Sequence, residues 1–170
     1  MTNIEVKFKK LHENALIPEA KSVGAGAMDV TCTEIVKKEG YMCCKLGFAT
    51  DIPAGYRAIC VPRSGITKTG WILANGVGVI DSDYRGEWEL RFIPVPKGLL
   101  SNYDELNKGT IDGEPCEIAT TIVIRDFPYQ VGDRVGQIFL EKVINIAFTP
   151  VDELEDSARG TGGFGSTGTT

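Results

Sequence analysis

The chain has 170 residues, of which 42% are hydrophobic and 24% are charged, as is typical of one globular domain with its own core. Its formal net charge of −5 argues against a basic surface, so we expect no direct nucleic-acid binding. No apolar run approaches the roughly 20 residues of a membrane span, and the first ten residues lack the apolar block of a signal peptide. We therefore expect a cytoplasmic protein with no membrane attachment.

Alternation of polar and apolar residues predicts many short β-strands. The first, residues 4–11, alternates as a half-buried strand does, and glycine or proline turns separate most of the others. No segment sustains a helical period, and we find no internal repeat. Besides two strands within segment 76–92, the expected strands are 4–11, 28–34, 41–46, 56–62, 71–74, 118–125, 134–141 and 143–148. This pattern predicts an all-β sandwich, jelly roll or barrel.

Segment 76–90, GVGVIDSDYRGEWEL, predicts a β-hairpin. Its first strand is apolar up to Ile80, and an acidic turn follows. Its second strand carries Trp88, Leu90 and Phe92 on one face. Asp81 begins the turn, where a carboxylate at the edge of a core can act as a base. The plainer interpretation is an Asx-type turn in which Asp81 bonds to its own backbone.

The cysteines and histidine exclude several kinds of site. Five cysteines include the adjacent pair Cys43 and Cys44, and no CxxC spacing occurs. This favours reduced thiols packed as small hydrophobic groups over a disulfide framework or a zinc site. The single histidine, His12, argues against a Ser-His-Asp triad or a centre with several histidine ligands.

Two polar segments stand apart from the strands. Residues 97–115 form a connection of a length that is uncommon in compact domains and is usually functional or mobile. Residues 157–170, SARGTGGFGSTGTT, have the composition of a disordered tail. However, Arg159 opens this run and Phe164 lies alone within it. An aromatic ring among glycines can stack on a base while neighbouring amides surround phosphates.

Three further motifs contain groups that suit a phosphate or a cation. Arg63, Ser64 and Gly65 follow a strand and offer a guanidinium, a hydroxyl and amides. Asp29 follows a loop of small residues and can hold a divalent cation through water. Gln137 lies on an otherwise apolar strand. Taken singly, each motif is better explained as an ordinary turn, cap or strand-edge residue.

The order of all five motifs is more specific. GAMDV, PRSG, GVIDSDYRG, GDRVGQ and RGTGGFGSTG resemble, in sequence order, the five motifs of the homotrimeric dUTPase family. The resemblance extends over nearly the whole chain. It implies a trimer with a jelly-roll-like distorted β-barrel that uses Mg²⁺ to hydrolyse dUTP to dUMP and pyrophosphate. This reaction limits uracil incorporation into DNA and supplies dUMP for dTMP synthesis. The resemblance also implies a barrel domain over residues 1–156 and a C-terminal arm over 157–170 that completes the active site.

The resemblance assigns a role to each matched residue. Asp81 is implied as the general base that orients water for attack on the α-phosphorus, and Asp29 as the residue that holds waters of Mg²⁺. Tyr84 is implied to pack on the deoxyribose. The residues implied at the phosphates are Arg63, Ser64, Gly65 and Gln137; those at the uracil are Asn75, Gly78, Val79 and Ile80; those of the arm are Arg159, Phe164, Gly165, Ser166 and Thr167.

The chain departs from the usual family pattern in four places, one of which is the segment 66–70 that follows PRSG. Met28 precedes Asp29 where an aromatic residue or leucine is usual, and Gly136 stands where alanine is common. The segment 97–115 is an insertion relative to compact members. Such inserts occur in some phage members and can contact partner proteins, so a protein partner and a host-cytoplasmic location of a phage protein are both open.

Two alternatives remain at this stage. The dCTP deaminase family shares the fold and much of the motif order, but it places a catalytic glutamate ten residues after the hairpin aspartate. Here that position is Arg91, and strand alternation places Glu89 on the same face as Arg91. The second alternative is a regulatory protein of this fold that acts through the insert.

Overall fold

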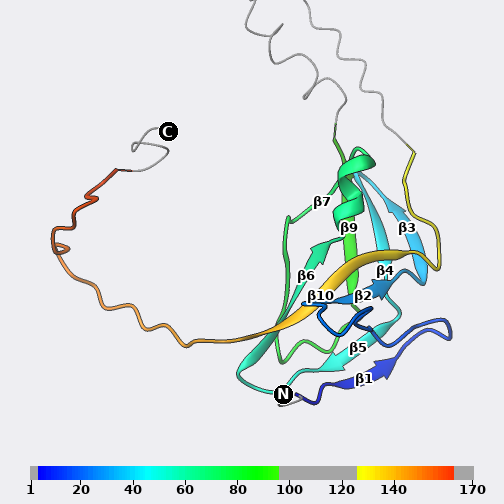
Figure 1. Ribbon diagram of the computed structural model, residues 1–170, viewed down its shortest axis with the longest axis horizontal. Coiled ribbons are helices and arrows are strands. Elements are labelled where there is room, and N and C mark those ends of the chain that lie inside the picture. Colours follow the sequence, from blue (N-terminus) through cyan, green and yellow to red (C-terminus); the bar gives the residue numbers. More distant parts are fainter. Residues whose placement is uncertain (1–3, 96–125, 163–170) are drawn as a thin grey trace, which may run out of the picture.

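The computed structural model describes residues 4–95 and 126–162 (Figure 1). In these ranges the regular elements are β-strands and one 3₁₀ helix, η1, at Ser64–Lys68. The strands are β1 Lys7–Lys10, β2 Met28–Thr31, β3 Glu34–Lys38, β4 Tyr41–Lys45, β5 Phe48–Asp51, β6 Tyr56–Pro62, β7 Trp71–Leu73, β8 Gly78–Ile80, β9 Glu89–Pro94 and β10 Arg134–Lys142. Within the described residues, no helix has the length and apolarity to cross a membrane.

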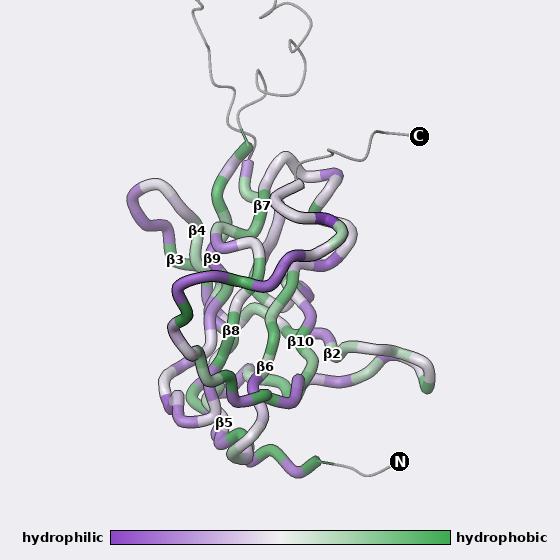
Figure 2. Tube along the Cα trace, turned by 90° about the vertical axis from the view of Figure 1, so that its left-hand side faces the viewer, coloured by the Kyte–Doolittle hydropathy of each residue, from purple (hydrophilic) through white to green (hydrophobic). Residues whose placement is uncertain are grey.

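Two antiparallel sheets enclose the core. One, here called the β6 sheet, has the strand order β2-β10-β6-β8, and the other, the β9 sheet, has the order β3-β4-β9-β7. Strands β1 and β5 form a separate two-stranded sheet. Figure 2 shows the hydrophobic stretches of β6, β8 and β10 running next to one another through the body. The prediction of an all-β, jelly-roll-like fold is confirmed.

The core forms because apolar residues alternate along the central strands. On β6, Ala58 and Cys60 point inward, and on the chain leading into β9, Trp88, Leu90 and Phe92 do the same, all with no more than 3% exposure. The predicted single face for the last three residues is therefore confirmed. The four cysteines in the described residues, Cys32, Cys43, Cys44 and Cys60, are buried free thiols, as expected.

The predicted hairpin over 76–90 is wrong. Strand β8 pairs with β6 in one sheet, whereas β9 pairs with β4 and β7 in the other. A short polar turn between the two strands predicts that they pair with each other. Residues 81–88 instead carry the chain from the β6 sheet to the β9 sheet. Strands β3 and β5 were not predicted as separate strands, although β1, β4, β6, β7 and β10 fall within or close to their expected ranges.

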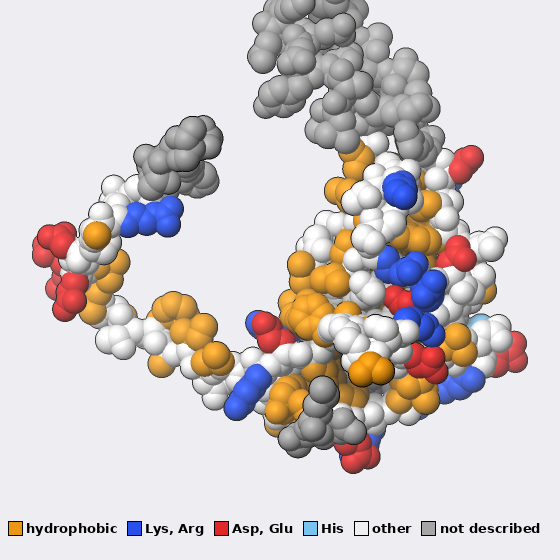
Figure 3. Space-filling view, in the orientation of Figure 1, with side chains coloured by type: hydrophobic (Ala, Val, Ile, Leu, Met, Phe, Trp, Pro, Cys, Tyr) orange, Lys and Arg blue, Asp and Glu red, His pale blue; other side chains and the backbone are white. Residues whose placement is uncertain are grey.

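The predicted strand at 143–148 is also wrong. The N–H of Val143 still donates to the Gly55 carbonyl at 2.8 Å, but beyond it the chain leaves the body without pairing and carries exposed apolar side chains along its length (Figures 1 and 3). Ile144 is 80% exposed and Phe148 is 91% exposed. The alternation that predicted a strand is present, but the described chain offers it no partner. The expected strand 118–125 and the whole of segment 97–115 lie outside the described residues.

Candidate functional site

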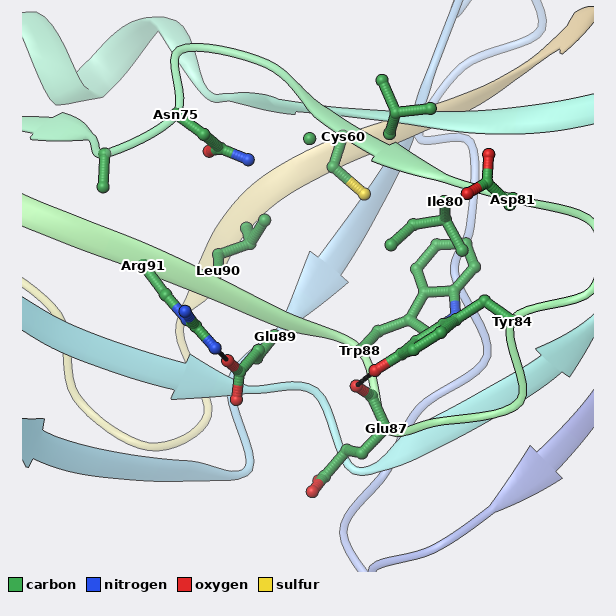
Figure 4. Close-up of a pocket in the computed structure, with 13 residues that line it drawn as sticks. Cys60, Asn75, Ile80, Asp81, Tyr84, Glu87, Trp88, Glu89, Leu90 and Arg91 are labelled. Carbon is green, nitrogen blue, oxygen red and sulfur yellow. Dashed lines mark hydrogen bonds and ion pairs between the residues drawn. The ribbon is translucent and has the colours of Figure 1, made fainter.

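A pocket of about 450 Å³ lies between β8 of the β6 sheet and β9 of the β9 sheet. Asn75 lies in the turn before β8, Asp81 directly follows β8, and Tyr84 lies beyond the next turn; Figure 4 shows these side chains around the pocket. The structure therefore brings together six residues predicted from the sequence to contact the base, the sugar or the attacking water. They are Asn75, Gly78, Val79, Ile80, Asp81 and Tyr84.

The polar wall of this pocket is the open edge of β8. Among the described residues, β8 pairs on one side only, with β6, and it ends the β6 sheet. An unpaired strand edge presents a row of backbone N–H and C=O groups. Such a row can bond to the donors and acceptors along the edge of a planar base. Gly78 suits this wall, because a Cβ there would lie 3.1 Å from Cys60 Cβ and 3.6 Å from Asn75 Nδ2.

The turn that carries Asp81 is held by Arg85. The Arg85 guanidinium donates from Nη1 to two backbone carbonyls, that of Ser82 at 2.6 Å and that of Tyr84 at 3.1 Å. Its Nη2 donates to Asp51 Oδ1 on β5 at 2.5 Å. The backbone N–H of Tyr84 also donates to the Asp81 carbonyl at 3.2 Å. One arginine thus ties the turn to a neighbouring sheet.

Tyr84 folds back over Gly86. Its hydroxyl donates to the Glu87 carbonyl at 3.1 Å (Figure 4). A Cβ on residue 86 would lie 2.3 Å from the Tyr84 hydroxyl oxygen, a distance that real Cβ atoms do not show. Glycine at this position is therefore required for the observed orientation of the tyrosine ring, which is 44% exposed at the pocket.

A second polar group surrounds Asp29 on β2. Its side chain is 6% exposed, and it is the one carboxylate classed as buried in the described part of the chain. Arg134 Nη1 donates to Oδ2 at 2.7 Å and Gln137 Nε2 donates to Oδ1 at 3.2 Å. Arg63 Nε lies 3.3 Å from Oδ1. Three predicted site residues, Asp29, Arg63 and Gln137, therefore meet directly.

This surrounding determines the charge state of Asp29. Burial alone would raise the pKa of its carboxyl group, but the hydrogen bond from Arg134, the charge of Arg63 and the hydrogen bond from Gln137 together hold the pKa below its ordinary value. Asp29 is therefore ionised at neutral pH. Directly after Arg63, Ser64 and Gly65 are exposed at the start of η1.

The two groups do not form one site within a single chain. Strand β2 is at one edge of the β6 sheet and β8 is at the other, with β10 and β6 between them. Three strand spacings amount to about 14 Å. The faces differ as well, because Asp29 pairs with Gln137 on the outer face, whereas the pocket opens toward the core residues Cys60 and Leu90. The sequence motifs are therefore distributed over two separate surfaces.

Glu89 and Arg91 form an ion pair beside the pocket, as Figure 4 shows. They lie on one face of β9, as strand alternation predicted, and Arg91 also lies over the Tyr41 ring at 5.3 Å. Glu89 accepts a hydrogen bond from the Cys43 thiol, and its pKa, despite partial burial, is lowered by that bond and by Arg91. The carboxylate is thus fixed and ionised by Cys43 and Arg91.

The beginning of the C-terminal arm is an exposed turn. The N–H of Gly160 donates to the carbonyl and to the hydroxyl of Ser157, both at 3.0–3.1 Å. Arg159 Nε donates to the Gly162 carbonyl at 2.9 Å. The other predicted arm residues, Phe164, Gly165, Ser166 and Thr167, lie outside the described residues.

Sequence reasoning missed three residues of these groups. Arg134 belongs to the GDRVGQ motif, and its position three residues before Gln137 was an available signal. Arg85 likewise lies inside the DSDYRG motif. Asp51 lies in no motif, and only the pairing of β5 beside the turn reveals its contact with Arg85.

Comparison with known proteins identifies the family. The sequence profile of the dUTPase family matches residues 13–95 and 110–168. The chain is 32% identical over 171 residues to the deoxyuridine 5'-triphosphate nucleotidohydrolase of Wolinella succinogenes, covering 99% of this chain and 97% of the relative. It is 29% identical over 168 residues to the enzyme of the same name from Helicobacter pylori, covering 97% of each.

A solved structure agrees with the fold. The dUTPase of Staphylococcus bacteriophage 80alpha, solved with dUPNHPP, superposes with a TM-score of 0.69 at 23% identity, covering 97% of this chain and 99% of the phage chain. At that identity the likeness concerns the fold, and the family follows from the profile and the full-length relatives. The chain belongs to the dUTPase family and is a dUTP diphosphatase.

Proposed function

We propose that this dUTP diphosphatase works as a homotrimer whose active sites are shared between copies of the chain. The observation that carries the proposal is the separation of the β8 pocket from the Asp29 group on opposite edges of one sheet. A site that needs both groups must take them from different copies. The exposed apolar side chains of residues 143–154 support this, because an exposed apolar series marks a surface that a partner covers.

The β8 pocket binds the deoxyuridine. The backbone edge of Gly78–Ile80, together with Asn75, supplies the donors and acceptors that select uracil over cytosine. A mispaired buried polar group costs about 1–3 kcal/mol, which is enough for useful discrimination. Tyr84 packs on the deoxyribose and leaves no room for a 2′-hydroxyl.

Asp81 orients the attacking water. It lies at the mouth of the pocket, exposed, and the turn that carries it is fixed by Arg85. From this position its carboxylate accepts a proton from a water placed in line with the α-phosphorus. The oxygen of this water forms a bond to the α-phosphorus as the bond from that phosphorus to the oxygen bridging to the β-phosphate breaks, which gives dUMP and pyrophosphate. Phosphoryl transfer needs positioning and charge neutralisation more than covalent help from the protein.

The Asp29 group of another copy receives the triphosphate. Arg63, Ser64, Gly65 and Gln137 offer cationic, hydroxyl and amide donors. The residues also fit a Mg²⁺ ion that arrives on the phosphates, because proteins usually hold Mg²⁺ with one or two carboxylates plus substrate oxygens and water. Asp29 accepts hydrogen bonds from Arg134 and Gln137 and forms an ion pair with Arg63, so part of its roughly fourfold acceptor capacity is left for a metal-bound water. When bound, the ion neutralises part of the triphosphate charge.

Residues 157–170 act as an arm that closes over the nucleotide, and residues 1–156 form the body. The turn at Ser157–Gly162 gives the arm a fixed start. Stacking of Phe164 on the uracil contributes roughly 1–3 kcal/mol, whereas ordering each arm residue costs about 1–2 kcal/mol. Contacts of Arg159, Gly165, Ser166 and Thr167 with the γ-phosphate are therefore needed as well.

Subunit complementation tests the shared site. Asp81→Asn removes the base, and Arg63→Ala removes a phosphate ligand from the other group. Each variant alone should release little pyrophosphate from dUTP. A mixture whose subunits have exchanged should recover activity, because some sites then combine an intact Asp81 with an intact Arg63. Failure of a verified mixed oligomer to recover any activity contradicts sharing.

Substrate selection is tested by pyrophosphate release from dUTP, UTP, dTTP and dCTP, with ammonia measured in parallel. We expect a clear preference for dUTP and no ammonia from dCTP, because Arg91 replaces the glutamate of a deaminase. A role of residues 97–115 in binding a protein partner is a separate proposal, tested by capture from a host lysate with and without these residues.

A further inference from the structure

Leu90 lies at the boundary between the core and the β8 pocket. It is 3% exposed, belongs to the core cluster and also lines the pocket with Cys60 and Ile80. Figure 4 shows its side chain rising from β9 toward Cys60, between the two strands that flank the pocket. Among the lining residues, Leu90 is buried and so belongs to the pocket floor, whereas Asp81 and Tyr84 are exposed at its mouth.

Gly136 on β10 makes room for this side chain. A Cβ on residue 136 would lie 2.3 Å from Leu90 Cδ1 and 3.1 Å from the Val61 carbonyl oxygen. The φ of Gly136 is outside the positive range that favours glycine, so its backbone conformation gives no reason for glycine here. Space is the reason. This accounts for the departure from the alanine that is common in the family at this motif position.

We infer that Leu90, with the space that Gly136 leaves for it, sets the depth of the base pocket and thereby the size of pyrimidine that the enzyme accepts. The core around Leu90 is closely packed, so a methyl group at position 136 can displace it only toward the empty side, which is the pocket. With Gly136, the leucine stays back against β10. The inference rests on the proposed binding of uracil in this pocket.

The orientation of the base in the pocket determines which of its ring substituents Leu90 contacts. A pyrimidine nucleotide enters with its sugar at the mouth, so the ring edge farthest from N1, formed by C4 and C5, faces the floor. An apolar leucine contacts the C5–H of uracil and leaves no space for the 5-methyl group of thymine. One methylene of mismatch in an apolar pocket changes discrimination by about 10- to 200-fold.

The test compares kcat/KM for dUTP and dTTP in wild type, Leu90→Ala and Gly136→Ala. Leu90→Ala should raise the dTTP to dUTP ratio by about tenfold or more, because the floor is lowered. Gly136→Ala should raise KM for dUTP by about tenfold or more as the displaced leucine fills the pocket. The double variant Gly136→Ala/Leu90→Val should bring KM back toward wild type, since the smaller side chain accepts the added methyl group.

The controls separate pocket shape from general stability. Ala49→Val overpacks β5, whose Ala49 is 4% exposed and lines neither described pocket, and it should lower Tm without changing the dTTP to dUTP ratio. If Leu90→Ala leaves that ratio unchanged, or if the double variant shows no rescue, the inference is overturned. Binding of a non-hydrolysable dUTP analogue to wild type is measured separately, because its absence contradicts the proposed pocket rather than the role of Leu90.

Discussion

Arg85 Nη2 and Asp51 Oδ1 lie 2.5 Å apart, and this contact joins the turn that carries Asp81 to strand β5. The same carboxylate accepts from Lys7 Nζ at 3.2 Å, so the link continues to β1. The hydrogen bond from Lys7 and the charge of Arg85 lower the pKa of Asp51, which is therefore ionised at neutral pH. A residue outside all five motifs thus supports the proposed base.

Asp51→Asn should lower kcat for dUTP by about tenfold or more, because small displacements of a reacting group are costly. The turn loses its charged anchor while the pocket walls stay, so KM should change much less. Tm should hardly move, since exposed ion pairs contribute little to stability. Steady-state kinetics and thermal unfolding check this. The control is Glu141→Gln, which breaks a comparably exposed pair with Arg57 away from the pocket; equal losses in both variants would contradict a positioning role.

Gly86→Ala should weaken the preference for dUTP over UTP. The added Cβ would lie 2.3 Å from the Tyr84 hydroxyl, so the ring must leave its observed position. Tyr84→Phe keeps the ring and removes only the hydrogen bond to Glu87, so it should keep most of the preference. The ratio of kcat/KM for the two nucleotides is the measurement. Discrimination that survives Gly86→Ala would show that another group excludes the 2′-hydroxyl.

The Asp29 group predicts a pH dependence of stability. The folded-state pKa of Asp29 is lowered, so its ion pairs stabilise the protein above the unfolded-state pKa of about 3.9 and are lost as pH falls through the folded-state value. Denaturant unfolding should therefore show Asp29→Asn destabilised at pH 7, with the difference from wild type shrinking below about pH 4. Asp152→Asn, on the exposed segment, makes the same charge change and should show no such difference. If the difference in unfolding free energy between wild type and Asp29→Asn stays constant with pH, the ion pairs of Asp29 do not contribute to stability as expected.

Removing residues 160–170 should lower turnover of dUTP severely while leaving the oligomer unchanged. The arm is proposed to close over the nucleotide, whereas the exposed apolar residues proposed to meet other copies lie before it, at 143–154. Removing residues 143–170 should also shift the protein to smaller species. Light scattering on a sizing column and pyrophosphate release distinguish the two truncations. Full activity of the variant that lacks residues 160–170 would contradict a role of the arm in turnover.

The sequence was informative where a local pattern decides the structure. Alternation places Trp88, Leu90 and Phe92 on the core face, and the five ordered motifs name residues that do meet, such as Asp29 with Gln137. Alternation does not say which strand is the partner. For that reason the turn after Ile80 was interpreted as a hairpin although it crosses between sheets.

Other features depend on contacts between distant residues. The leucine that Gly136 accommodates is 46 positions earlier in the chain, and Asp51 meets Arg85 across two elements. Residues 143–148 have the alternation of a strand, but they find no neighbour in one copy. A single sequence contains no local signal for these relationships, because each is a matter of packing in space.

The open edge of β8 also affects how the protein behaves without its substrate. An unpaired edge is a template on which the strand of another molecule can add, and proteins limit this with short edges and charges. Here the edge is three residues long, and Asp81 and Asp83 follow it directly. The carboxylate proposed as the base therefore also protects the edge against self-association. Asp81→Asn removes both functions, so that variant should associate more readily than wild type unless nucleotide covers the edge.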